Sequence, residues 1–340
     1  MNNNSFCSSC LPTLTNCTNC SSNVSISNKT LFTGNMSMIE HHNSPKFIPS
    51  SELEVSLDDS NKLGRGGFGT VYSAKWLGSP VAVKVVDSSS TVATRLRQEA
   101  ALMASINHPL VIRLFGICEF DNKLGIVMEK ADGILPVPSK LNQKTLQYAI
   151  DIVSAVKLLH SKNIIHGDLK PENILLVNGK IKLTDFGSAR TCSTTSSDVS
   201  TILTTPKYAP IESFDGIHSY KGDVYSIGLI LYELLCDKLA FKGLMLNSLL
   251  MKKFEDYVPN FDAKVSPQLK EIITRCVASK PEERPDFVEI KDFLDELLVS
   301  TPKDHFERYK VVYILLGIGL FVFLIYAAFV VWSDILFRLS

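Results

Sequence analysis

The stretch HGDLKPENIL, residues 166–175, places charged and polar side chains at a spacing that could serve phosphoryl transfer. Asp168 can accept a proton from an attacking hydroxyl, and Lys170 can steady a transferring phosphoryl group. Asn173 can supply an oxygen ligand for Mg²⁺, together with Asp185 of the later stretch TDFG. These residue types in this order predict a magnesium-dependent transfer to a hydroxyl group.

A glycine-rich stretch, GRGGFGTV, lies between two strand-like segments and could approach phosphate groups closely. Its glycines are Gly64, Gly66, Gly67 and Gly69. It is not a Walker loop, because no Gly-Lys-Ser/Thr ends it, and a strand follows where a dinucleotide fingerprint needs a helix. Lys84 stands in an otherwise apolar strand and needs an anionic partner, which bound phosphate or Glu99 would supply. Each feature alone also fits an ordinary turn or surface charge, but their order favours a nucleotide site.

Two kinds of apolar periodicity divide the chain between about Glu52 and Leu298. Alternating or β-branched stretches predict strands at 70–76, 81–86 and 123–130. Apolar residues three and four apart predict helices at 94–106, 144–160, 221–236 and 287–298. Strand patterns fade after Ile181 and helical patterns dominate from there. An α+β architecture follows, with a small β-rich lobe preceding a larger α-helical lobe.

These motifs in this order resemble the eukaryotic protein kinase family, over about residues 57–298 within a domain placed at 53–298. The chain is similar to serine/threonine kinases of the tyrosine-kinase-like group. The resemblance implies the bilobal protein kinase fold, ATP and Mg²⁺ as cofactors, and proteins as substrates. By motif, Lys84 would hold the α- and β-phosphates and pair with Glu99. Asp168 would be the catalytic base, and Asn173 and Asp185 would bind Mg²⁺.

The resemblance also assigns the adenine pocket and three structural residues. Met128 would be the gatekeeper, and Glu129 to Ala131 the hinge between the lobes. The remaining contacts to ATP would come from the glycine-rich stretch and from Leu63, Val71, Ala82 and Leu175. Asp223 is similar to the buried aspartate that braces the catalytic loop. Glu212 and Arg284 resemble the ion pair that ties the activation segment to the helical lobe.

Two departures from the family pattern predict altered regulation and substrate binding. Gly167 replaces the arginine that in many kinases grips an activation-loop phosphate, so we expect weaker dependence on that phosphate. In TTPKYAPIE, Thr205, Tyr208 and Glu212 keep their spacing, but Ala-Pro is displaced by one residue. We therefore expect an unusually shaped substrate-binding segment.

Two questions leave an alternative open: which amino acid accepts the phosphate, and whether the chain is an active enzyme. Lys170 in DLKPEN and Thr205 before the substrate-binding segment resemble serine/threonine kinases, while a dual-specificity or tyrosine-directed enzyme is the alternative. A pseudokinase acting as a membrane scaffold is the other alternative. It would predict loss of a catalytic residue, but Lys84, Asp168 and Asn173 are kept, as is Asp185.

The C-terminal stretch Val311–Trp332 has 22 residues without a charge and predicts a transmembrane helix. At ~1.5 Å per residue it would cross the ~30 Å hydrocarbon core of a bilayer. Residues 299–310 would form a tether and 333–340 a short tail. Lys303, Arg308 and Lys310 on its N-terminal side place the kinase domain in the cytosol, as a single-pass protein of an unidentified membrane.

The amino-acid composition indicates which classes of binding partner to expect. Lys+Arg and Asp+Glu both number 35, and this balance argues against nucleic-acid binding. Residues 1–50 are rich in Asn, Ser and Thr, which predicts a disordered tail. Two Cys-x-x-Cys pairs in it could bind Zn²⁺, at Cys7, Cys10, Cys17 and Cys20, although a cysteine-containing tail without metal is the favoured interpretation.

Overall fold

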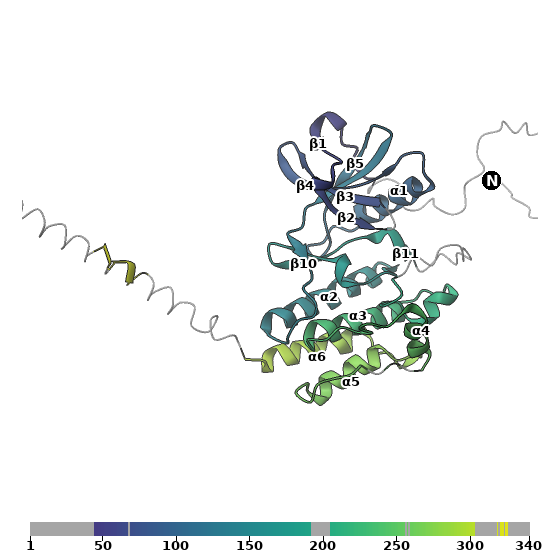
Figure 1. Cartoon of the computed structure of the whole chain (residues 1–340), viewed down its shortest axis with the longest axis vertical. Coiled ribbons are helices and arrows are strands. Elements are labelled where there is room, and N and C mark those ends of the chain that lie inside the picture. The colour runs from purple at the N-terminus through teal and green to yellow at the C-terminus, as the bar shows by residue number, and fades with distance from the viewer. Residues whose placement is uncertain are drawn as a thin grey trace, which may run out of the picture. The chain divides into compact units, whose positions relative to one another are not determined.

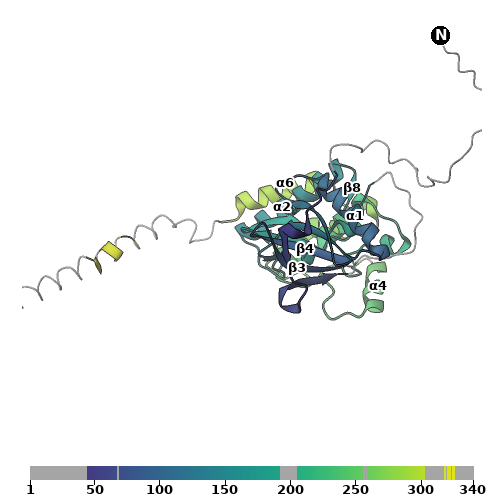
Figure 2. The ribbon, with the colours of Figure 1, turned by 90° about the horizontal axis from the view of Figure 1, so that it is seen from above.

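The computed structural model describes residues 44–66, 69–191, 205–255, 257, 259–302, 318, 320–322 and 324–325. Within them a sheet-rich N-lobe precedes a helical C-lobe, as Figure 1 shows. Seen from above (Figure 2), the strands β3 and β4 of the N-lobe lie over the helices of the C-lobe. The predicted α+β architecture, with a small β-rich lobe before a larger helical lobe, is confirmed.

Six antiparallel strands form the N-lobe sheet. They are β1 (Leu53–Val55), β2 (Lys62–Gly66), β3 (Gly69–Trp76), β4 (Ser79–Asp87), β5 (Leu114–Phe120) and β6 (Lys123–Glu129). Their order is β1-β3-β4-β6-β5, with β2 also paired to β3. Successive side chains of β4 point to opposite faces, so Val83 and Val85 join one core and Ala82 and Val86 the other. Helix α1 (Thr91–Ala104) packs beside β4, β5 and β6.

A segment before β1, residues 44–52, runs across the N-lobe sheet, and we call it the strap. Its Ile48 donates a backbone hydrogen bond to Ile117 of β5 (2.8 Å), whose own N–H bonds to the carbonyl of Lys46 (2.8 Å). A Cβ at Gly116 would lie 2.2 Å from that carbonyl, so only glycine lets the strap approach this closely. Further along, Trp76 donates its indole N–H to Glu52 (3.0 Å). The strap therefore joins β5 to the other side of the sheet.

The strap corrects the extent of the predicted tail. We expected residues 1–50 to be disordered, yet residues 44–50 pack on the sheet and Ile48 has no exposed surface. The physical reason is that one buried side chain, Ile48, and two backbone hydrogen bonds to Ile117 suffice to anchor the backbone to β5. Residues 1–43, including Cys7, Cys10, Cys17 and Cys20, lie outside the described residues.

The C-lobe is built around helix α3 (Tyr220–Leu235), which is buried from Asp223 to its end. It packs against α2 (Gln143–Ser161) and α5 (Pro267–Cys276), and α2 packs against α6 (Phe287–Ser300). Helix α4 (Leu246–Phe254) lies at the edge of the lobe. Side chains at the N-caps begin four of these helices: Asn142 for α2, Ser219 for α3, Ser266 for α5 and Asp286 for α6.

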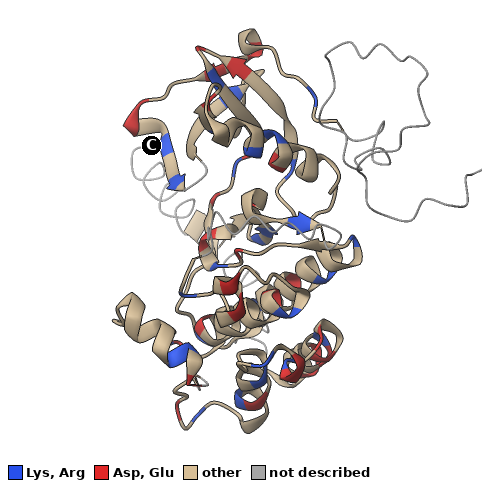
Figure 3. Ribbon diagram, turned by 90° about the vertical axis from the view of Figure 1, so that its right-hand side faces the viewer, with Lys and Arg blue, Asp and Glu red and all other residues tan. Residues whose placement is uncertain are grey.

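Short strands next to the helices hold residues 166–175 and Asp185. They are β7 (Gly133–Ile134), β8 (Ile164–Ile165), β9 (Ile174–Val177), β10 (Lys180–Leu183) and β11 (Arg190–Thr191). They pair in the orders β10-β9-β7 and β11-β8. The stretch HGDLKPEN leads from β8 to β9, and Asp185 follows β10. In Figure 3 both acidic and basic residues occur on each lobe.

Most of the predicted span Val311–Trp332 lies outside the described residues. Only Ile318, Leu320–Val322 and Leu324–Ile325 are described there, and these are helical and exposed. Among the residues that the structure does describe, no helix has both the length and the apolar character to cross a membrane. The tail 333–340 and most of the tether are likewise outside the described part.

The strap yields a stability prediction. Replacing Ile48 by Ala should lower the free energy of unfolding by about 2–4 kcal/mol, because a fully buried side chain leaves a cavity above the sheet. Phe47→Ala is the matched control, because this neighbouring side chain is 57% exposed and should cost less than about 1 kcal/mol. Urea denaturation of the two variants measures the difference, and equal losses would contradict the role of the strap.

Candidate active site

A buried lysine at the lobe interface holds two carboxylates. Lys84 of β4 lies with its Nζ 2.8 Å and 2.9 Å from the two oxygens of Glu99, which projects from α1. The same Nζ is 2.7 Å from Oδ1 of Asp185, which follows β10 in the C-lobe. Lys84 and Glu99 are 6% and 4% exposed, so their charges depend on each other and not on water. The three predicted residues are therefore brought together from three elements.

Electrostatics keep this lysine charged. Burial lowers the pKa of Lys84, but attraction to Glu99 and Asp185 outweighs it and raises the pKa above its ordinary value. Burial raises the pKa of Glu99, and the opposing effect of Lys84 does not cancel it. For Asp185 burial also acts upward, yet Lys84, with help from His166 and Lys170, brings its pKa below the ordinary value. Lys84 is thus a cation and Asp185 an anion at neutral pH.

The predicted proton acceptor lies within a compact network. Asp168 is 6% exposed, and its Oδ2 is 2.6 Å from Nζ of Lys170. Lys170 also donates to Oγ1 of Thr205 (2.9 Å), whose backbone N–H in turn donates to Oδ1 of Asp168 (2.9 Å). One segment of the chain is thereby fixed beside the carboxylate. Asp168, Lys170 and Thr205 are thus in mutual contact. A hydroxyl that approached Asp168 would lie next to Lys170 and Thr205.

A buried aspartate braces the backbone of this stretch. Asp223 of α3 is 1% exposed and accepts the N–H groups of His166 and Gly167, each at 3.0 Å. His160 of α2 lies 2.7 Å from the same carboxylate. Gly167 has φ +76°, and a Cβ there would lie 3.0 Å from the carbonyl of Ser188. Glycine therefore adopts this left-handed turn without the strain that any side chain would bring.

Asn173 and Asp185 are placed as a pair of oxygen donors. Thr184, next to Asp185, donates its N–H to the carbonyl of Asn173 (3.0 Å). The amide nitrogen of Asn173 donates to the carbonyl of Asp168 (2.8 Å), and none of the described residues donates to its Oδ1. An amide oxygen and an ionised carboxylate on adjacent turns fit the ligand preference of Mg²⁺. The donor set therefore suits the predicted metal.

The residues predicted to surround adenine come from the N-lobe sheet, from the hinge after β6 and, in the case of Leu175, from strand β9. Ala82 of β4 stands opposite Met128 of β6 in the pairing register, and both are buried. Half-buried side chains packed against the main core include Val71, Ala131 and Leu175, while Leu63 is 51% exposed. Gly67 lies outside the described residues. At Gly69 (φ +130°) a Cβ would meet the carbonyl of Val85 at 2.8 Å, so glycine is required there.

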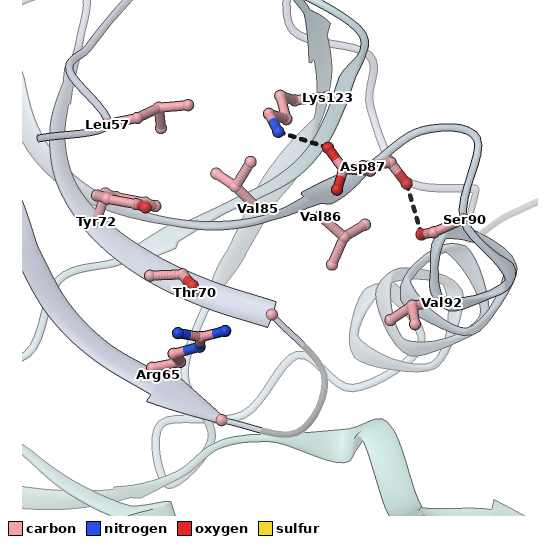
Figure 4. A pocket seen from close by; sticks show the side chains of 12 residues that line it. Leu57, Arg65, Thr70, Tyr72, Val85, Val86, Asp87, Ser90, Val92 and Lys123 are labelled. Atoms are coloured by element: carbon pink, nitrogen blue, oxygen red, sulfur yellow. Dashed lines mark hydrogen bonds and ion pairs between the residues drawn. The ribbon is translucent and has the colours of Figure 1, made fainter.

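A separate pocket lies between the glycine-rich hairpin of β2 and β3 and the end of β4. It has a volume of about 340 Å³ and is lined by Arg65, Tyr72, Val85 and Lys123, among others, as Figure 4 shows. Lys123 contacts Asp87, which also lines it. Lys84, Glu99 and Asp185 are not among its lining residues. This pocket is therefore not the cleft that contains Lys84.

An ion pair at the hinge was not predicted. Glu129, expected in the hinge, directs its carboxylate to Lys182 of β10, with N–O distances of 2.7 Å and 3.0 Å. It also accepts the N–H of Arg113 (3.2 Å). The side chain of Glu129 therefore joins the lobes, and its backbone N–H donates to the carbonyl of Arg113 (2.9 Å). In the sequence, Lys182 stands between two apolar residues of a strand. A lysine at such a position usually faces solvent, so the pattern did not indicate a partner.

The predicted structural pair in the C-lobe lies beneath the segment that follows Thr205. Arg284, 2% exposed, contacts Glu212 through two nitrogens, with one N–O distance of 3.1 Å. It also donates to the carbonyls of Ala278 (2.8 Å) and Ser279 (3.0 Å).

Two further buried charged residues, Glu233 and Lys253, were not predicted from the sequence. Glu233 accepts the hydroxyl of Tyr208 (2.8 Å).

Comparison with known proteins agrees with this geometry. A family model described as the protein kinase domain matches residues 57–294. The chain is 30% identical over 272 residues to the probable serine/threonine-protein kinase PknB of Lactococcus lactis, which covers 74% of this chain and 43% of that protein. It is 34% identical over 244 residues to calcium-dependent protein kinase 5 of Plasmodium berghei (67% of this chain, 43% of that protein).

A third relative is the dual specificity protein kinase shkD of Dictyostelium discoideum, 31% identical over 288 residues (77% of this chain, 38% of that protein). The chain thus spans less than half the length of these curated relatives. The family model, in contrast, covers more than half of the chain itself. The chain belongs to the protein kinase family.

Proposed function

We propose that this chain is an active serine/threonine kinase that transfers the γ-phosphate of ATP to hydroxyl groups of proteins. The proposal includes the finer assignments made from the sequence, namely membership of the tyrosine-kinase-like group and anchoring by Val311–Trp332 with the kinase domain in the cytosol. Printed names of relatives, such as the probable serine/threonine-protein kinase of Lactococcus lactis, support the acceptor class.

The observation that carries the proposal is the contact of Lys84 with both Glu99 and Asp185. A lysine bridging the two lobes within a buried site places a cation where the phosphates of ATP would lie. Asp168 is connected to the same region through Asn173, whose amide donates to its carbonyl at 2.8 Å. A pseudokinase scaffold has no need for this set of buried charges, which costs desolvation energy to maintain.

Each residue has a distinct part in the proposed reaction. Lys84 binds the α- and β-phosphates, and Glu99 keeps its ammonium group oriented. Asp168 orients the acceptor hydroxyl and accepts its proton, while Lys170 stabilises negative charge on the transferring group. Asn173 and Asp185 would hold Mg²⁺, which when bound neutralises charge on the phosphate oxygens.

The acceptor and adenine contacts complete the proposal. Thr205 lies against Lys170 and Asp168, as expected for an enzyme that takes serine or threonine hydroxyls. Ala82 and Leu175 would enclose the adenine ring. A dual-specificity enzyme is the second candidate, and the name of the Dictyostelium relative is the observation in its favour.

Two substitutions test the chemistry. The full chain in mild detergent is incubated with ATP, Mg²⁺ and a mixture of acceptor proteins, and the products are hydrolysed for phosphoamino-acid analysis. Lys84→Met and Asp168→Asn should each lower the rate by at least about 10²-fold, because each removes a group that acts in the transition state. Lys75→Met, an exposed lysine on the neighbouring strand β3, is the matched control and should keep wild-type activity.

Phosphoserine and phosphothreonine without phosphotyrosine is the expected product. Phosphotyrosine beside them would favour the dual-specificity enzyme. A folded wild-type protein that binds ATP but transfers no phosphate would contradict the proposal.

Gly167 predicts weak dependence on activation-segment phosphorylation. Dephosphorylation with a protein phosphatase should lower kcat/KM by less than about threefold, because no arginine precedes Asp168 to receive a phosphate. The network of Asp168, Lys170 and Thr205 is formed without one. The rate is compared before and after phosphatase treatment and removal of the phosphatase. A loss of tenfold or more would show that another group performs the missing role.

The anchor is tested separately from the chemistry. A variant ending at residue 310 should move from the membrane fraction to the supernatant after cell lysis, because it lacks all 22 uncharged residues of Val311–Trp332. The full chain should stay in the pellet after washing with carbonate. Retention of the shortened chain on membranes would contradict the proposed anchor.

A further inference from the structure

Lys253 is a buried lysine on helix α4, and it is not among the residues assigned to ATP binding or catalysis above. The residue is 3% exposed. Its Nζ donates to the carbonyl of Lys207 (3.0 Å) and to that of Ala209. The rings of Tyr225 and Phe241 lie on either flank, with centroids 4.7 Å and 5.0 Å from Nζ. The terminal nitrogen thus points at the backbone of the segment that follows Thr205.

Such a site is costly for a lysine. Among the residues that the structure describes, no carboxylate lies within ion-pair distance of Lys253, and burying a cation without a carboxylate partner is unfavourable. A methionine of similar length would fill the same space between two aromatic rings without that cost. The contacts that only lysine makes are the two hydrogen bonds to backbone carbonyls. These contacts are therefore the feature that needs an explanation.

The two carbonyls belong to a short turn whose first residue, Thr205, contacts Asp168. We call residues Thr205–Pro210 the substrate shelf. Inside it, Tyr208 and Ala209 donate their N–H groups to the carbonyl of Thr205, at 3.0 Å and 3.1 Å. Thr205 in turn contacts Asp168 and Lys170. A continuous set of hydrogen bonds therefore runs from Lys253 through the shelf to Asp168.

We propose that Lys253 is a positioning residue that holds the substrate shelf in the conformation in which a protein acceptor is presented to Asp168. The inference rests on the proposed kinase activity. It assigns Lys253 to the binding of the protein substrate and not to ATP, because its contacts are confined to the shelf and to the aromatic rings of the C-lobe. It also gives a use to the displaced Ala-Pro, since one of the two carbonyls is that of Ala209.

The surroundings of Lys253 make its charge sensitive to pH. Burial lowers its pKa to about 7, while Glu212 acts to raise it and Arg284 to lower it further. Other ionisable groups near the shelf and the aromatic rings are Lys207, Tyr208, Tyr225, Glu233 and Tyr257. Burial raises the pKa of Tyr208, Tyr225 and Tyr257, so these stay neutral, and Lys207 is paired with Glu233 at 2.6 Å. With a pKa of about 7, Lys253 itself changes charge near neutral pH.

Stability should respond to this proton with a definite sign. Because the pKa is lower in the folded protein, the unfolded chain binds more protons between about pH 7 and the ordinary lysine value of 10.5. The contribution of Lys253 to the free energy of unfolding therefore becomes more favourable as the pH rises through this range. Below about pH 7 the buried cation carries its full cost. Lys253→Met should consequently not lower the melting temperature at neutral or lower pH.

The test uses the full chain in mild detergent and the acceptor protein that the wild type phosphorylates best. Lys253→Met should raise the KM for this protein about tenfold and leave the KM for ATP unchanged, since charge-assisted hydrogen bonds to the shelf are lost. In the wild type the KM for the acceptor should rise as the pH passes from about one unit below 7 to one unit above, and the variant should lack this step. Lys252→Met is the matched control, because its side chain is 57% exposed on the same helix.

Amide hydrogen exchange gives a readout that does not need activity. The N–H groups of Thr205, Tyr208 and Ala209 should exchange faster in Lys253→Met than in the wild type or Lys252→Met. Unchanged exchange, or an unchanged KM for the acceptor in an active enzyme, would overturn the inference. Faster exchange in a protein that transfers no phosphate would support the hold on the shelf and refute the proposed kinase activity instead.

Discussion

The structure depends on one buried cation that requires two anions from different parts of the chain. The ammonium group of Lys84 is held in the interior by Glu99 and Asp185, and leaving it without them would cost several kcal/mol. Strand β4, helix α1 and the turn after β10 must therefore meet at one point. The sheet, the strap across it and the C-lobe are arranged so that this meeting occurs.

A second buried charge organises the catalytic stretch in the same way. Asp223 turns the backbone at His166 and Gly167 through two hydrogen bonds, and this fixes the direction of the next side chain, Asp168. Gly167 adopts the left-handed turn there without the strain that a side chain would bring. One substitution relative to the family pattern thus eases the turn and leaves no arginine before Asp168.

The residues that carry motifs could be predicted from the sequence, because their order along the chain is informative without any knowledge of contacts. Lys84 and Glu99 were expected to pair and do so, and Asp185, expected as a ligand of Mg²⁺, lies against the same lysine. Regular periodicity likewise predicted the central strands and the long helices, such as α2 at 144–160. The sequence did not predict roles that depend on a contact with a residue far away in the chain. The strap has too few apolar residues to show a period.

Lys253 illustrates the same limit on a helix. In the stretch LLMKKF two adjacent lysines look like a solvated surface, and nothing local distinguishes the buried lysine from the exposed one. Lys182 was missed for a similar reason, because alternation in a strand does not tell which outward-facing charge will meet a partner from the other lobe. The substrate-binding segment was expected to be unusual, but its support from α4 depends on tertiary packing.

The pair of Glu129 and Lys182 has a mechanical consequence. It joins the last residue of β6 in the N-lobe to β10 in the C-lobe, so a movement that parted β6 from β10 would have to separate these charges. With side chains 22% and 16% exposed, the pair keeps access to water, and its strength is on the order of 1 kcal/mol. That is less than twice the thermal energy RT. The pair therefore restrains the two strands only weakly against such a movement.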